Sequence, residues 1–144
     1  MKTSFTVCLG SALSVGVAAE EARFMALGDL TGGEFSSEAS GISADGTAVS
    51  GSSLIDQAGR TEAFLWTEET GMVGLGDLSG GAFRSRASAV SADGSTVVGT
   101  SASGSGTEPF RWTHVESMLG LGDLPKGIFS CEASGVSADG SVVV

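Results

Sequence analysis

The chain is poor in basic residues, aromatic residues and cysteine. Its 144 residues include seven Lys and Arg, one His, two Cys and no Tyr, against 17 Asp and Glu, for a formal net charge of −10. Because so few scattered basic residues cannot neutralise a phosphate backbone, we expect no nucleic-acid partner. An acidic balance of this kind favours solubility.

Proline and long helix-forming runs are also scarce, whereas glycine is abundant. The chain has two Pro and 23 Gly, and 17% of its residues are charged. A glycine inside a helix costs about 0.5–1 kcal/mol relative to alanine, so this composition disfavours a helical bundle. Glycine, serine, threonine and valine suit short strands and tight turns. The composition therefore predicts an all-β chain.

The first 19 residues have the pattern of a secretory signal peptide. Lys2 precedes an apolar run from Phe5 to Ala19, and Val17-Ala18-Ala19 supplies small residues before a cut after Ala19. The run is shorter than the roughly 20 apolar residues that span a bilayer. A buried first strand or helix is the alternative. We expect no membrane span in the rest of the chain, and we expect a secreted or cell-surface location.

The two cysteines predict no disulfide framework. Cys8 lies in the predicted signal peptide, and its removal leaves Cys131 as the one thiol of residues 20–144. Cys131 occupies a repeat position that holds Ser37 and Ser85 in the other copies. We interpret it as an incidental substitution and not as a reactive site.

Two four-residue motifs recur along the chain in a fixed order. LGDL is found at 27–30, 75–78 and 121–124, and SADG at 43–46, 91–94 and 137–140. A period of about 46 residues is the signature of a repeat architecture. The motifs divide the domain, residues 20–144, into repeats at about 24–71, 72–117 and 118–144, of which the last is incomplete.

Each repeat is predicted to contain four short strands. The predicted strands are 72–76, 87–91, 95–99 and 63–67, the last of which has its later match at 110–112. Side chains two apart share one face of a strand, so Phe64 and Trp66 are expected on a buried face. The residue between them, Leu65, has Arg111 as its counterpart, which predicts a half-exposed position. One strand carries small residues that suit close backbone approach, namely Ala39, Gly41, Ala87, Ala89, Ala133 and Gly135.

Four strands in about 46 residues match the blade of a β-propeller. We therefore predict tandem four-stranded antiparallel sheets forming a partial β-propeller of about two and a half blades, with the small-residue strand innermost. A β-solenoid is the alternative. Propellers close with four to eight blades, so we expect a fragment of a longer exported protein. Self-association through exposed sheet edges is the other way to complete a ring.

The stretches FMALGDLTGGEFSSEASGISADGTAVSGSS and AFLWTEETGMVGLGDLSGG resemble the HAF-type extracellular repeat family of bacteria. The resemblance covers nearly all of residues 23–144. It implies an exported or surface protein with propeller-like repeats and no established catalytic residue. The His-Ala-Phe triplet that names the family is absent, since those positions read Glu62-Ala63-Phe64 and Glu108-Pro109-Phe110.

No residue pattern predicts a catalytic, cofactor-binding or metal-binding site. His114 is the single histidine, so it lacks the partners that a metal site or a nucleophilic triad needs. The recurring aspartates suggest calcium or glycoside hydrolysis, but each stands alone in its motif, whereas a calcium loop gathers several oxygen ligands within a few residues. We expect turn capping of these aspartates, which are Asp29, Asp77, Asp123, Asp45, Asp93 and Asp139.

The sequence thus favours a non-catalytic binding or structural module. The segments Leu54–Thr61 and Ala102–Glu108 differ most between copies, which predicts contact loops for an unknown ligand, a protein or a glycan. The alternative is an incomplete propeller enzyme of the sialidase or lyase kind whose catalytic residues lie in blades outside this chain.

Overall fold

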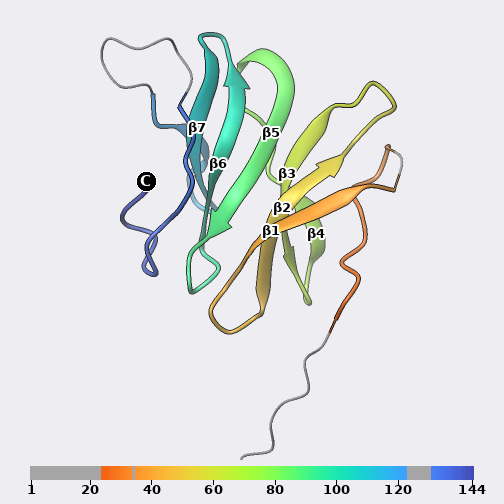
Figure 1. The fold of residues 1–144 in the computed structure, drawn as a ribbon, viewed down its shortest axis with the longest axis vertical. Coiled ribbons are helices and arrows are strands. Elements are labelled where there is room, and N and C mark those ends of the chain that lie inside the picture. Colours follow the sequence, from red (N-terminus) through yellow and green to blue (C-terminus); the bar gives the residue numbers. More distant parts are fainter. Residues whose placement is uncertain (1–23, 34, 123–130) are drawn as a thin grey trace, which may run out of the picture.

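The protein folds as two four-stranded antiparallel sheets, without a helix in the part of the chain that the structure describes (Figure 1). The structure is a computed structural model, and it describes residues 24–33, 35–122 and 131–144. The predicted signal peptide, 1–19, and Cys8 and Asp123 lie outside the described residues. The prediction of an all-β chain with tandem four-stranded antiparallel sheets is confirmed.

Each sheet is a meander in which consecutive strands pair. The first sheet has the order β1-β2-β3-β4 and the second has the order β5-β6-β7-β8. The strands of the first sheet are β1 Ser37–Ile42, β2 Ala48–Leu54, β3 Thr61–Thr67 and β4 Gly71–Gly74. Those of the second are β5 Gly80–Val90, β6 Thr96–Ser103, β7 Gly106–Thr113 and β8 Ser117–Gly120.

The boundaries of the two sheets differ from the boundaries of the repeats that the LGDL and SADG motifs define. The sequence places 72–76 as the first strand of the second copy, but β4 pairs with β3 and closes the first sheet. In the same way β8 pairs with β7. Each sheet therefore takes its last strand from the residues just before the next LGDL motif.

The first sheet has two different faces. Val49 pairs with Trp66 and Gly51 with Phe64, so these side chains share what we call the Phe/Trp face. The opposite, small-residue face carries Ala48, Ser50, Ala63 and Leu65. Gly51 is required on the Phe/Trp face, because a Cβ there would lie 2.7 Å from the ring of Phe64.

The main core lies between the two sheets. Phe110, Trp112 and Val97 on the Phe/Trp face of the second sheet form one buried cluster with residues of the first sheet. The residues that they meet are Ala48, Ala63 and Leu65 of the first sheet, and Leu75, which follows β4, joins the same cluster. The large aromatic side chains of the second sheet thus pack against the small side chains of the first sheet, which gives a densely packed interface.

The expected half-exposed position is wrong for Leu65. Leu65 is only 5% exposed, because the second sheet covers the small-residue face of the first. Its counterpart Arg111 lies on the face of the second sheet that points away from the first sheet. The Arg111 side chain is 31% exposed and forms a 2.7 Å ion pair with Glu116. The same repeat position is therefore buried where a complete sheet packs against it and partly exposed where none does.

The first two LGDL segments lie on the Phe/Trp faces. Leu27 and Leu30 pack on Phe64 and Trp66, and their counterparts Leu75 and Leu78 join the cluster of Phe110 and Trp112. The recurring leucines of this motif therefore contribute to the packing of both clusters. They cover part of each Phe/Trp face.

The small-residue strand lies where the two sheets approach each other. A Cβ on Gly41 of β1 would lie 3.1 Å from the backbone nitrogen of Val90 and 3.2 Å from the Cα of Ala89 in β5. The predicted close backbone approach is confirmed at this point. Residues 131–144 continue the repeat: Val136 and Val143 form an isolated antiparallel bridge, and Ala133 is buried.

Candidate functional surface

The turns of the repeats gather at two opposite ends of the molecule. The turns between β2 and β3 and between β6 and β7 lie at one end, which we call the variable rim (Figure 1). The SADG turns lie at the other end, which we call the SADG rim. The two rims differ in sequence variation between copies and in hydrogen bonding.

Each SADG turn is locked by its own aspartate. The Oδ1 atom of Asp93 accepts hydrogen bonds from the Ser91 hydroxyl at 2.6 Å and from the Ser95 hydroxyl and N–H at 2.8 and 3.0 Å. Asp45 and Asp139 make the same set of contacts in their turns. The predicted turn-capping role of this aspartate series is confirmed.

These hydrogen bonds also hold the three carboxyl groups ionised. The pKa of Asp45 is lowered to about 2, chiefly by the Thr47 N–H and the Ser43 hydroxyl. The pKa values of Asp93 and Asp139 are likewise lowered to about 2, and the first cause is the hydroxyl of Ser91 and of Ser137 respectively. Donors that favour the charged form make each turn an anionic, preformed element.

Backbone hydrogen bonds join the successive turns of the SADG rim. The Ala44 N–H donates to the Ala92 carbonyl at 3.0 Å, and the Ala92 N–H donates to the Ala138 carbonyl at 3.1 Å. A Cβ on Gly94 would lie 2.8 Å from the Cβ of Ala48, so the turns also pack closely on the preceding sheet. This rim is therefore a scaffold that fixes the spacing of the repeats.

The aspartate of the first LGDL motif is also structural. Asp29 accepts hydrogen bonds from the N–H of Leu30 at 3.0 Å and of Ser36 at 3.1 Å, and from the Ser53 hydroxyl. The Leu30 N–H also donates to the Ser53 hydroxyl at 3.2 Å, and in the second copy the Leu78 N–H donates to the corresponding Ser101 hydroxyl at 2.9 Å. Within the described residues, no group of three or more His, Cys, Asp or Glu could hold a metal ion.

Two glutamates and one serine have roles that the sequence analysis missed. The Oε1 atom of Glu62 accepts the Gly76 N–H, and that of Glu108 accepts the Gly122 N–H, both at 2.9 Å. The glutamates thus tie each sheet to the following LGDL segment, and their recurrence at one repeat position was the available signal. Ser85 accepts the buried Ala63 N–H at 2.9 Å and donates to the Gly76 carbonyl.

The first turn of the variable rim, 55–60, is held rigidly. Asp56 accepts the N–H groups of Ala58 and Arg60 and forms a 2.5 Å ion pair with the Arg60 guanidinium. The Arg60 N–H and side chain lower the pKa of Asp56. The Arg60 guanidinium lies 6.0 Å from the centre of the Phe83 ring, within cation–π range. The turn therefore presents a defined surface.

The second turn is shorter than the sequence predicts. Most of Ala102–Glu108 belongs to β6 and β7, and only Gly104 and Ser105 form the connection. The pairing of Ser103 with Gly106 extends the strands to this point, and the Gly104 N–H donates to the Ser79 carbonyl at 3.3 Å. The variable rim thus combines one protruding turn with one tight hairpin.

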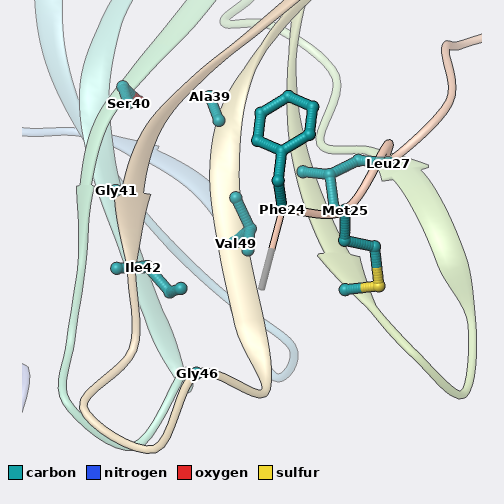
Figure 2. A pocket seen from close by; sticks show the side chains of 9 residues that line it. All are labelled: Phe24, Met25, Leu27, Ala39, Ser40, Gly41, Ile42, Gly46 and Val49. Carbon is teal, nitrogen blue, oxygen red and sulfur yellow. The ribbon is translucent and has the colours of Figure 1, made fainter. Parts of the chain in front are cut away.

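An apolar hollow of about 620 Å³ lies on the Phe/Trp face of the first sheet. Figure 2 shows Phe24, Met25 and Leu27, from the segment before β1, beside Val49 of β2, with Ile42 of β1 farther along. A second hollow of about 450 Å³ is lined by residues that include Trp66, Glu68 and Glu69. His114 is exposed and lies edge-on to Trp112, with ring centres 4.9 Å apart.

No helix in the described part of the chain is long and apolar enough to cross a bilayer. Comparison of the chain with protein-family models, with curated proteins and with solved structures gives no match.

Proposed function

We propose that the protein is a secreted or cell-surface repeat protein that acts as a non-catalytic binding module, similar to the HAF-type extracellular repeats. Its sheets are the blades of a propeller-like array, with β1 and β5 innermost. The observation that supports this most is the structural difference between the two rims. One rim repeats the same self-locked turn, whereas the other carries turns that differ between copies.

Binding at the variable rim is supported by the way its first turn is built. Asp56 and Arg60 pair with each other, so the turn keeps its shape without contacts from a ligand. Preorganised loops on a fixed scaffold lose little conformational entropy on binding. The signal peptide pattern of residues 1–19 and the resemblance to an exported family support an extracellular location.

The test replaces the variable rim and measures binding. Residues 55–60 are exchanged for a Gly-Ser segment of equal length and Gly104-Ser105 for Asn-Gly, and the proteins are screened on immobilised glycans and extracellular proteins. We expect saturable binding by the original chain, its loss in the variant, and an unchanged melting temperature.

The control variant, Asp45→Asn, alters the opposite rim and is expected to bind normally. Binding that survives replacement of both turns would contradict a ligand site at the variable rim. Release of a cleaved glycan product would contradict a non-catalytic module and favour the enzyme alternative.

A further inference from the structure

A polar groove, which we call the edge groove, crosses the edge strands β1 and β5 where the two sheets meet (Figure 1). Three adjoining hollows of about 200, 400 and 310 Å³ form it. Arg86 lines all three hollows. Glu38 lines those of 200 and 400 Å³, and Glu132 lines those of 400 and 310 Å³. Arg86 therefore lies between the two glutamates along the groove.

The three charged side chains occupy one repeat position. The position holds Glu38 in the first copy, Arg86 in the second and Glu132 in the third. Hydroxyl residues stand beside them in the sheets, since Glu38 pairs with Ser52 and Arg86 pairs with Thr100. Both hydroxyl residues line the groove as well. The repeat thus builds a row of alternating charges with hydroxyl groups next to it.

The charges of the edge groove are not neutralised within the part of the chain that the structure describes. The ion pairs there join Arg60 to Asp56 and Arg111 to Glu116, and neither pair lines the groove. Glu38, Arg86 and Glu132 are exposed. The Arg86 guanidinium therefore offers its N–H donors to a ligand, and the two carboxylates offer acceptors on either side of it.

Thr61 adds a polar group without a partner to the wall of the edge groove. It is 7% exposed, and its hydroxyl oxygen makes no hydrogen bond to the described residues. It lines the hollow of 200 Å³ together with Glu38 and Arg86. Because a buried hydroxyl without a partner costs free energy, a polar group bound at this end of the groove is favoured.

The charge pattern and the shape of the edge groove select the ligand. A guanidinium binds a carboxylate through two parallel hydrogen bonds, so the complement of the row is a carboxylate between two cations. The net charge of −10 disfavours a polyanion. An elongated groove suits an extended peptide, in which alternate side chains lie on one face.

We propose that the edge groove binds an extended peptide in which one acidic residue stands between two basic residues, each two positions away. Arg86 binds the acidic side chain, and Glu38 and Glu132 bind the basic ones. The site is separate from the turns of the variable rim, because none of residues 55–60 lines the groove. It therefore goes beyond the ligand site proposed above.

The test compares two labelled pentapeptides with blocked ends, Lys-Ser-Glu-Ser-Lys and Lys-Ser-Gln-Ser-Lys, by fluorescence anisotropy with the purified chain. Unspecific attraction to an acidic protein favours the Gln peptide, which has the higher positive charge. The proposal predicts the opposite. We expect the Glu peptide to bind at least about tenfold more tightly, because only its carboxylate pairs with Arg86.

Two protein variants locate the preference. Arg86→Gln should abolish the preference for the Glu peptide. Arg111→Gln removes the same charge from a residue that does not line the edge groove, so it should keep the preference. Circular dichroism and melting temperature show that each variant is folded.

Four results would each overturn the proposal. They are no binding of either peptide, equal or tighter binding of the Gln peptide, a preference that survives Arg86→Gln, and a preference that a folded Arg111→Gln variant loses. A glucuronate-containing tetrasaccharide is measured in parallel. If it binds more tightly than the Glu peptide, the site recognises an acidic glycan and the peptide proposal is wrong.

Discussion

At the scale of single residues, the junction between the sheets depends on a matched donor and acceptor. Ser85 satisfies the N–H of Ala63, which is completely buried. At the next junction the corresponding residues are Cys131 and Pro109. Proline has no N–H to donate, so a hydroxyl acceptor is not required there. A thiol can therefore stand at this serine position without leaving a backbone N–H of residue 109 unsatisfied.

Loss of the Ser85 hydroxyl should therefore destabilise the protein. Ser85→Ala leaves the buried Ala63 N–H without its acceptor, which should lower the free energy of unfolding by about 1–3 kcal/mol. Ser37→Ala is the control, because Ser37 is exposed and its hydroxyl donates to the Gly28 carbonyl, with no buried N–H of the described residues among its hydrogen-bond partners. Urea denaturation measures both. Equal effects of the two variants would contradict the role assigned to Ser85.

At the scale of the elements, the SADG turn is the most regular unit of the structure. Three copies share one hydrogen-bonding pattern, although the third belongs to an incomplete repeat. This regularity shows that the turn is specified locally. Ser, Asp and Gly at fixed spacing supply a hydroxyl donor, a carboxylate acceptor and a residue that adopts positive φ, here +75°, +74° and +71°.

The turns make stability depend on pH in the acid range. Because the pKa of Asp93 is lowered from 3.8 to about 2 in the folded protein, its contribution is complete above about pH 4 and is lost as the pH falls toward 2. Asp93→Asn does not titrate, so its melting temperature should fall less steeply between pH 4 and 2. Glu68→Gln, which alters an exposed side chain outside these turns, should keep the original slope. An unchanged slope in Asp93→Asn would exclude this mechanism.

At the scale of the whole molecule, stacking of one sheet on the next decides which residues are core. Leu65 and Arg111 occupy the same repeat position, but only Leu65 has a complete sheet against it. Repeat units of this kind obtain much of their stability from the interface with a neighbour. We therefore expect the packing of the second sheet on the first to make a substitution at Leu65 cost more free energy of unfolding than one at Arg111.

Substitution by alanine should separate the two positions. Leu65→Ala removes buried methyl groups and should lower the free energy of unfolding by about 2–4 kcal/mol. Arg111→Ala removes a partly exposed side chain and an ion pair with an exposed glutamate, so its effect should stay within about 0.5 kcal/mol. Similar losses in the two variants, measured by urea denaturation, would contradict the stacking interface.

The sequence by itself determined the strands, the four-stranded period and the SADG turns, because these depend on residue alternation and on hydrogen bonds within a few residues. The alternation of residues also predicted the buried Phe64 and Trp66, but only the tertiary structure decided that the opposite face of the first sheet is buried as well. Leu65, Glu62 and Ser85 take their roles from partners in the adjacent sheet or in the LGDL segment that leads to it. Such contacts depend on how neighbouring repeats pack, and no local pattern specifies them.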